Sequence, residues 1–215
     1  MYQRFIKRAI DIVLSLIGLI VLAPVFLIAA VWIRLDSRGP VMFTQQRVGR
    51  GKKLFRIRKF RTMRLDAPHD MPTHMLETPD AHITRAGRLL RLTSLDELPQ
   101  LWNILVGHMS IVGPRPALWN QDDLSAERDL YGANDVRPGL TGWAQIHGRD
   151  ALEIADKARL DGEYVRHLTL KMDLTCFLYT FGTVLRRTGV IEGGTGVVAR
   201  RYEARREEIE RNKGV

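Results

Sequence analysis

A chain of 215 residues is long enough for one domain with a sizeable hydrophobic core. Its formal charge of +9 indicates polyanionic partners, such as nucleic acid, anionic lipid or phosphorylated substrates. The single cysteine, Cys176, excludes an internal disulfide, and its apolar neighbours indicate a buried side chain.

An uncharged segment from Ile12 to Ile33 dominates the N-terminal part. It is long enough to cross a bilayer, which needs about 20 residues, and its apolar core is too long for a signal peptide. Basic residues flank it on both sides, and the positive-inside rule favours the cytoplasmic side for both flanks. Pro24, near the middle, permits a sharp bend. The pattern therefore favours a re-entrant helix that bends at Ala23-Pro24 over a single span, which stays the alternative.

Two short strands, Val41 to Gln45 and Leu54 to Phe60, are predicted around a turn whose glycines allow positive φ. Half of the residues from Arg47 to Arg64 are Lys or Arg. After a membrane segment, such a cluster is typical of contact with anionic lipid. Alternatively, Lys59 or Arg61 points inward to a phosphate. Nucleic-acid binding is disfavoured by the preceding membrane anchor.

The segment from Asp66 to His82 is rich in Pro, Met, His and Thr and is predicted to be a loop. Its histidines have spacings that fit no zinc site. Arg85, Arg88 and Arg91 then recur every three residues on a predicted helix. Either these arginines form a solvated face, or one of them, with Arg88 the first candidate, faces an active site.

The adjacent carboxylates Asp96 and Glu97 lie at the predicted start of the next helix. Ser94 and Glu97 match the capping-box pattern, and Pro99 is tolerated only in a first turn. The helix dipole would favour the ionised form of both carboxylates. An ionised aspartate can act as a nucleophile and an ionised glutamate can hold a divalent cation. Acidic residues are also common in first turns for capping alone.

Two stiff loops follow. In the first, Arg115 is fixed between two prolines, and a fixed guanidinium suits a phosphate. The second, Arg137 to Gln145, carries a tryptophan that could stack on a base, contact the membrane interface or join the core. Asp161 and Asp173 lie on predicted helices, where each is either an acid of the site or a surface charge. The charged C-terminal segment is predicted to be an exposed helix without chemistry.

Together these segments closely resemble the bacterial sugar transferase family, the monotopic phosphoglycosyl transferases. The resemblance extends from Lys7-Arg8 to about Arg187, and the chain resembles the short form of the family. It rests on motifs that are specific as an ordered set: Lys59 to Met63, Ser94 to Gln100, Val112 to Pro116 and Arg137 to Gln145.

The resemblance implies transfer of a sugar-1-phosphate from a UDP-sugar to undecaprenyl phosphate with release of UMP, the first membrane step of surface glycoconjugate synthesis. It implies a ping-pong mechanism in which Asp96 forms a covalent phosphosugar-aspartate, while Glu97 binds Mg²⁺. Pro24 matches the bend of the re-entrant helix, and His147 replaces an Asn of many relatives. Substrate or phosphate binding is implied for Lys59, Arg88, Arg115, Asp161 and Arg137.

We therefore expect an α+β fold, predominantly helical, with a kinked re-entrant membrane helix, one small β-hairpin and amphipathic interfacial helices. The expected parts are a membrane helix with basic flanks (1–36), a cytoplasmic catalytic domain (37–187) and a charged tail (188–215). The expected location is the cytoplasmic face of the bacterial inner membrane, in contact with anionic lipids and without nucleic acid. A non-catalytic membrane adaptor that binds polyprenol phosphate is the alternative. The sugar, the downstream polymer and the formation of a homodimer are left open.

Overall fold

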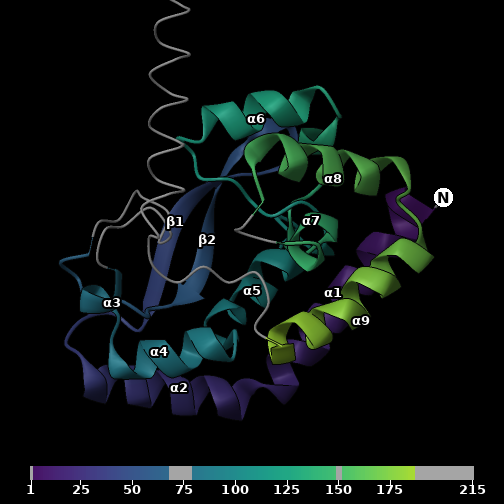
Figure 1. Ribbon diagram of the computed structural model, residues 1–215. Helices are drawn as coiled ribbons and strands as arrows, with labels where there is room; N and C mark the ends of the chain where they lie inside the picture. The colour runs from purple at the N-terminus through teal and green to yellow at the C-terminus, as the bar shows by residue number, and fades with distance from the viewer. Residues whose placement is uncertain (1, 68–78, 149–151, 187–215) are drawn as a thin grey trace, which may run out of the picture.

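The computed structural model describes residues 2–67, 79–148 and 152–186, so the expected tail (188–215) and the middle of the expected loop lie outside it. The fold is α+β and predominantly helical, as expected, with helices packed around a β-hairpin (Figure 1). The strands are β1 (Met42–Val48), β2 (Leu54–Phe60), β3 (Ser110–Val112) and β4 (Gly139–Thr141). The helices are α1 (Lys7–Val21), α2 (Ala23–Asp36), α3 (Pro79–His82), α4 (Arg85–Leu92), α5 (Gln100–Leu105), α6 (Asp122–Asp129), α7 (Trp143–Ile146), α8 (Ile154–Arg166) and α9 (Leu170–Arg186).

The N-terminal apolar segment forms two helices, α1 and α2, which meet at an angle of 59°. The Leu22 N–H donates to the Gly18 carbonyl and the Phe26 N–H to the Leu22 carbonyl, both at 2.9 Å, so the helical bonding resumes directly after Pro24. The predicted bend beside Pro24 is therefore present. Among the described helices, none alone has the length and hydropathy of a bilayer span, and only this bent pair reaches them together. The re-entrant course through a bilayer stays a prediction.

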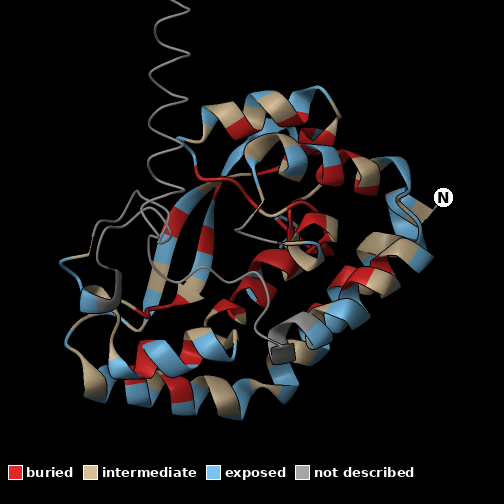
Figure 2. Ribbon diagram, viewed as in Figure 1, coloured by how far each residue is buried: buried red, intermediate tan, exposed pale blue. Residues whose placement is uncertain are grey.

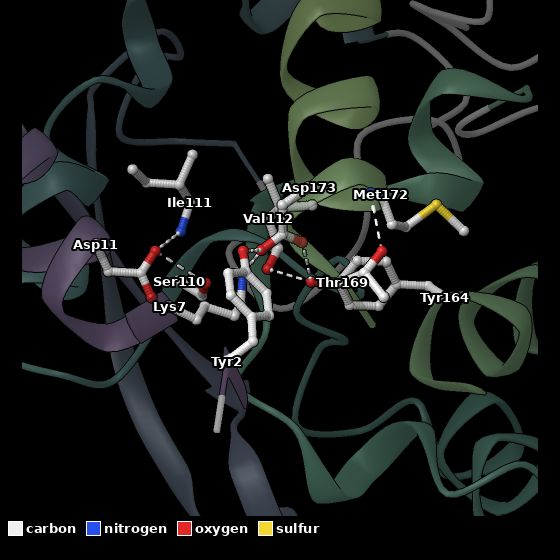
Figure 3. Close-up of polar contacts among 10 residues, drawn as sticks. All are labelled: Tyr2, Lys7, Asp11, Ser110, Ile111, Val112, Tyr164, Thr169, Met172 and Asp173. Atoms are coloured by element: carbon white, nitrogen blue, oxygen red, sulfur yellow. Dashed lines mark hydrogen bonds and ion pairs between the residues drawn. The ribbon is translucent and has the colours of Figure 1, made fainter. Parts of the chain in front are cut away.

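The inner face of α1 packs on the rest of the molecule through small and polar residues. Gly18 lies against Leu101 of α5, where an added Cβ would come within 3.0 Å of a leucine methyl. Asp11 is buried and accepts hydrogen bonds from the Ser110 hydroxyl at 3.0 Å and the Ile111 N–H at 2.9 Å (Figure 3). The outer faces of α1 and α2 are exposed (Figure 2). They carry the large apolar side chains of Val13, Leu16, Ile17, Ile20, Val21, Leu27, Ile28, Val31 and Leu35.

The start of α1 is also tied to the start of α9. The carboxylate of Asp173 accepts from the Tyr2 hydroxyl at 2.5 Å, the Lys7 ammonium at 2.6 Å and the Tyr164 hydroxyl at 2.7 Å (Figure 3). Asp173 is buried, so it is neither a surface charge nor an unpaired acid. This cluster fixes the first turn of α1 to a helix that is distant in the sequence.

The hairpin of β1 and β2 pairs in an antiparallel register that places Met42 opposite Phe60. Alternate residues of β2 point into the core, and the intervening Arg56 and Arg58 are exposed. At the tip, Gly51 and Lys52 have positive φ (63° and 61°). The expectation that both glycines of the turn supply positive φ is wrong for Gly49, whose backbone is extended (φ −104°).

The short strands β3 and β4 form a parallel pair that the sequence analysis did not predict. They bring together the two stiff loops, and glycines permit this close approach. A Cβ on Gly139 would lie 2.1 Å from the Gly113 nitrogen, and one on Gly142 would lie 2.1 Å from the Gly113 oxygen. Strands of three residues that are mostly buried are too short to show an alternating pattern, so the sequence does not predict them.

The main core lies between α1, the hairpin, α5 and α9, and it includes Cys176, as expected. A smaller core joins α2 to β2 and α4, where the Phe26 and Phe60 rings meet edge to face at 5.7 Å. The Asp36 carboxylate also accepts from the Ala86 N–H at 2.9 Å and so connects the end of α2 to the start of α4. The main core consists of Phe55, Ile57, Leu101, Ile104, Met109, Ile111, Val112, Tyr164 and Cys176.

Candidate active site

The acidic pair lies on a 3-10 turn, Leu95–Glu97, between α4 and α5. Ser94 enters this turn in the left-handed region (φ 55°), and its side chain makes no capping hydrogen bond, so the predicted capping box is wrong. The prediction that a helix begins close to the pair is confirmed, because Pro99 directly precedes α5. The turn between two helices presents both carboxylates to the same neighbourhood of basic residues.

Glu97 is the centre of a buried charge cluster. Its Oε1 accepts from the Lys59 ammonium at 2.8 Å and from the Arg115 guanidinium at 3.0 Å. Lys59 comes from the end of β2 and Arg115 from the loop after β3, so distant segments converge on one carboxylate. Burial lowers the pKa of Lys59, and the charge of Glu97 opposes that change. The two candidates for an inward position are Lys59 at the end of β2 and Arg61 just after it, and Lys59 is the one that reaches the acidic pair.

Asp96 lies within the electrostatic reach of the same cations. Burial raises the pKa of its carboxyl to about 6, and the neighbouring charge of Glu97 adds to the rise. Lys59, Arg91 and Arg115 act in the opposite direction on this pKa. Burial outweighs these cations in the net shift, yet a pKa of about 6 leaves most of Asp96 ionised at neutral pH. The expected contribution of the helix dipole stays a prediction.

Two residues without any predicted role hold this cluster in place. The buried side chain of Asn103 donates to the Arg56 carbonyl at 2.8 Å and accepts from the Arg58 N–H at 3.0 Å. It thereby attaches α5 to the strand that carries Lys59. Arg47 donates to the Pro116 carbonyl at 3.1 Å and supports the loop of Arg115. An asparagine within a helix and one arginine among many carry no signal that sequence reasoning could have used.

The remaining arginines near the site have separate partners. Arg61 is buried and donates to the carbonyls of Ser37 at 2.9 Å and Arg38 at 2.5 Å, so it holds the end of α2. Arg91 donates to the Thr62 hydroxyl at 2.9 Å and also lowers the pKa of Asp96. Of the three arginines on α4, Arg91 is therefore the one that the structure brings close to the pair.

Three predicted site residues have no hydrogen bond or ion pair with the acidic pair within the described part of the chain. Arg88 is exposed on α4. Asp161 is buried in an ion pair with Arg128, at 2.6 and 2.9 Å, which connects α8 to α6. Burial raises the pKa of Asp161, while Arg128 counteracts the rise. Arg137 donates to the Gly107 carbonyl at 2.9 Å, beyond the other end of α5. Their substrate-binding roles stay predictions.

The tryptophan of the second stiff loop, Trp143, is half-buried against the main core, which favours the core alternative. The His147 ring lies 4.1 Å from the Trp143 ring, centroid to centroid. The His147 Nδ1 is 2.8 Å from the Trp143 carbonyl oxygen. No substrate is needed to explain this arrangement.

The donor set at the acidic pair is compatible with Mg²⁺. Protein Mg²⁺ sites usually take one or two carboxylates and complete the coordination with water and substrate phosphates. Asp96 and Glu97 supply such carboxylates, and a diphosphate would balance the added positive charge. Among the described residues, no group of three or more His, Cys, Asp or Glu side chains forms a complete protein metal site. The fit therefore depends on a ligand that brings its own oxygens.

A model of the bacterial sugar transferase family matches residues 2–187. The chain belongs to this family. The match includes every segment on which the expected resemblance rests, from the bent helix pair to α9. The family assignment agrees with the convergence of the first three motifs, which supply Lys59, the acidic pair and Arg115.

Curated relatives carry related names. The chain is 39% identical over 191 residues to the UDP-N-acetylgalactosamine-undecaprenyl-phosphate N-acetylgalactosaminephosphotransferase of Aeromonas hydrophila, covering 86% of this chain and 45% of that protein. It is 39% identical to the UDP-glucose:undecaprenyl-phosphate glucose-1-phosphate transferase of Escherichia coli, covering 83% and 40%. It is 42% identical to the exopolysaccharide production protein PSS of Rhizobium leguminosarum, covering 84% and 94%. The chain thus spans less than half of the first two relatives and nearly the whole of the third.

Proposed function

We propose that this protein transfers a sugar-1-phosphate from a UDP-sugar to undecaprenyl phosphate and releases UMP. The observation that carries the proposal is the buried cluster in which Lys59 and Arg115 meet Glu97 beside Asp96. Cations placed around a carboxylate nucleophile are what phosphoryl transfer requires, because the reaction depends on positioning and on charge stabilisation. The names of the relatives support the same substrates and differ in the sugar. The sugar is therefore left unassigned.

The proposed reaction has two displacements at one phosphorus atom. An Asp96 carboxylate oxygen attacks the β-phosphorus of the UDP-sugar, and the bond from this phosphorus to the bridging oxygen breaks, so that UMP leaves with the bonding electrons. An oxygen of undecaprenyl phosphate then attacks the same phosphorus, and Asp96 leaves as a carboxylate. The raised pKa of Asp96, about 6, makes its anion a better nucleophile than an ordinary aspartate, while most of it is still ionised at neutral pH.

The neighbouring side chains would stabilise the charge that moves between these groups. Lys59 and Arg115 approach Glu97 from two segments, so both cations lie beside the pair where the phosphate groups would bind. A guanidinium held by a proline on either side loses little entropy when it binds a phosphate oxygen. Glu97 would hold Mg²⁺ together with the diphosphate, and the ion would neutralise charge on the phosphate oxygens.

The proposed location is the cytoplasmic face of the bacterial inner membrane, with α1 and α2 as a re-entrant pair. The support is the bend of 59° and the apolar outer surface of both helices. The helix α9 adds exposed apolar residues, including Leu170, Leu174 and Leu178. An anchor of this kind would keep the catalytic cluster near the head group of the lipid acceptor.

The test is UMP release across a panel of UDP-sugars, with undecaprenyl phosphate and Mg²⁺ present. The wild-type chain should release UMP with at least one donor, Asp96→Asn should abolish release, and Asp156→Asn, an exposed carboxyl on α8, should retain it. Incubation with the donor alone should leave a phosphosugar mass on the peptide that contains Asp96. An adduct on another residue would refute the proposed mechanism. No release with any donor, together with retained binding of undecaprenyl phosphate, would support the non-catalytic adaptor.

A further inference from the structure

A second basic site lies at the opposite end of α5 from the acidic pair. A cavity of about 690 Å³ opens there, between the first turns of α1, the hairpin tip and the end of α8. The acidic pair precedes the first residue of α5, whereas this cavity adjoins the carbonyls at its end. A six-residue helix is about 9 Å long, so the two sites are separate. Its charged lining residues are Lys7, Arg8, Asp11, Arg50, Asp135 and Arg137.

Three arginines from distant segments face this cavity. Arg8 lies on α1, Arg50 lies at the hairpin tip and Arg137 precedes β4. The hairpin tip is held over the cavity by the ion pair of Lys52 with Asp129. Burial lowers the pKa of Arg137, and the positive charges of Arg8 and Arg50 lower it further. Arg8 and Arg50 therefore both lie within electrostatic range of Arg137.

The protein's own acceptors satisfy only part of this charge. Arg8 donates through Nη1 to the Ile104 carbonyl at 2.6 Å and through Nη2 to the Leu105 carbonyl at 2.8 Å. Arg137 uses its Nε on the Gly107 carbonyl. These contacts explain why both residues lie at the end of α5. Within the described part of the chain, however, neither the terminal nitrogens of Arg137 nor the guanidinium of Arg50 has a hydrogen bond or an ion pair.

The acids around the cavity offset the charge of the arginines only in part. The charge of Asp11 raises the pKa of Arg137, and Arg8 in turn lowers the pKa of Asp11, but no ion pair joins these groups among the described residues. The Oδ1 of Asp11 accepts hydrogen bonds from the Ser110 hydroxyl and the Ile111 N–H. Asp135 is exposed at the rim of the cavity. The fourth cation of the lining, Lys7, is already paired with Asp173, outside the cavity. The arginines thus outnumber the acids of the lining, and a site of this charge favours an anion.

We propose that this cavity is a second anion site, which binds one phosphate group through Arg8, Arg50 and Arg137. One guanidinium group can donate two parallel hydrogen bonds to two oxygens of the same phosphate. The terminal nitrogens of Arg137 and the guanidinium nitrogens of Arg50 could donate such bonds. A volume of about 690 Å³ is in the usual range for small-molecule pockets, about 300 to 1,000 Å³. The phosphate belongs either to a lipid head group or to a soluble compound, and the experiment below separates the two.

The alternative that the bound phosphate belongs to a lipid head group depends on the proposed membrane location. The cavity is lined by α1 residues that precede the apolar run from Ile12, so a re-entrant α1 would place it at the depth of the head groups. The apolar side chains of Val165 and Leu168 beside the arginines would then meet the upper part of an acyl chain. A soluble phosphate would use the arginines alone.

The test is arginine footprinting of the full-length wild-type chain in neutral detergent and phosphate-free buffer. Phenylglyoxal modifies accessible guanidinium groups, and peptide mass spectrometry gives a rate for each arginine. The probes are inorganic phosphate, dioctanoyl phosphatidylglycerol and, as a zwitterionic control, dioctanoyl phosphatidylcholine. We expect Arg50 to react at least three-fold more slowly with phosphatidylglycerol or with phosphate, and Arg56, exposed on the same hairpin, to keep its rate.

The outcomes decide both the site and the source. Protection of Arg50 by phosphatidylglycerol alone assigns a lipid head group, and protection by inorganic phosphate assigns a soluble phosphate group. Equal protection by phosphatidylcholine, protection of Arg56 to the same degree, or no protection at all overturns the proposal. The rate at Arg115 reports the acidic-pair site in the same experiment, so failure of one site is distinguishable from failure of the other.

Substitutions give a second measurement. Arg50→Gln should weaken binding of the protecting probe at least five-fold in a calorimetric titration, because the exposed Arg50 side chain supplies positive charge to the cavity and makes no hydrogen bond or ion pair with the described residues. Arg56→Gln removes the same charge from the same hairpin and should change the affinity less than two-fold. Equal effects of the two variants would show that the binding follows net charge and would refute a built site.

Discussion

Replacement of Asp96 by Asn should stabilise the protein while it removes the proposed nucleophile. The folded state raises the pKa of this carboxyl from 3.8 to about 6, mainly through burial. A shift of that size corresponds to a destabilisation of at most about 3 kcal/mol at neutral pH, which the neutral amide would not carry. For a chain of this length, about 3 kcal/mol corresponds to a rise in melting temperature of about 6 to 12 °C.

The pH dependence separates this effect from a general gain in packing. The pKa of Asp96 is higher in the folded state than in the unfolded state. The destabilisation by Asp96 is therefore at its full value above pH 6, where the carboxyl is ionised in both states. It decreases as the pH falls, because the folded state takes up its proton first, and it is lost below pH 3.8. The advantage of Asp96→Asn over wild type should therefore shrink to about half its free-energy value at pH 5.

The assay is thermal unfolding in detergent, followed by circular dichroism at pH 7.5 and pH 5. Asp156→Asn is the matched control, since its exposed carboxylate makes only a 3.5 Å ion pair with Arg159. We expect the control to shift stability by less than about 0.5 kcal/mol. A lower melting temperature for Asp96→Asn at pH 7.5, or a gain that is unchanged at pH 5, would refute the reasoning.

Three further predictions concern the site and its supports. Gly87→Ala should destabilise the fold by more than about 2 kcal/mol, since its Cβ would lie 2.0 Å from the Thr62 oxygen, and chemical unfolding measures this. Gly182→Ala, in open space on α9, should instead stabilise by up to about 1 kcal/mol, and equal effects would contradict the first prediction. Asp161→Asn should cost about 3 to 5 kcal/mol in the same assay, because it leaves Arg128 buried without its counter-charge, and a loss below 1 kcal/mol would show that water replaces the carboxylate. UMP release should rise with pH through about 6, as Asp96 ionises, and a flat profile from pH 5 to 8 would contradict its role as nucleophile.

Sequence reasoning located the bend beside Pro24 and the strands of the hairpin because these depend on local signals. A proline in an apolar run and alternating residues around a glycine turn each fix a backbone geometry. The family resemblance assigned Lys59, Glu97 and Arg115 to one site, and the structure brings their side chains together, which no local pattern could have shown. Their roles in the reaction stay predictions.

The errors arose where long-range packing decides the outcome. The capping pattern at Ser94 is a valid local signal, but the turn between α4 and α5 places this residue in the left-handed region. The raised pKa of Asp96 was not predicted, because it comes from the burial that tertiary contacts impose. The buried partners of Asp173 and Asp161 come from segments that are distant in the sequence, and single residues carry no record of them.

The hydrogen bonds of Tyr2 and Lys7 with Asp173 have a consequence for the order in which the protein folds during synthesis. Lys7 and Asp173 are 166 positions apart, and Asp11 and Ser110 are 99 apart. At a synthesis rate of about 5 to 20 residues per second, roughly 8 to 33 s separate the appearance of the two residues of the longer pair. During that interval α1 and α2 have emerged without their last anchor. Under the proposed membrane location, lipid would cover the apolar faces of α1 and α2 during this interval. The first turn of α1 gains its contacts with α9 only after Asp173 has been synthesised.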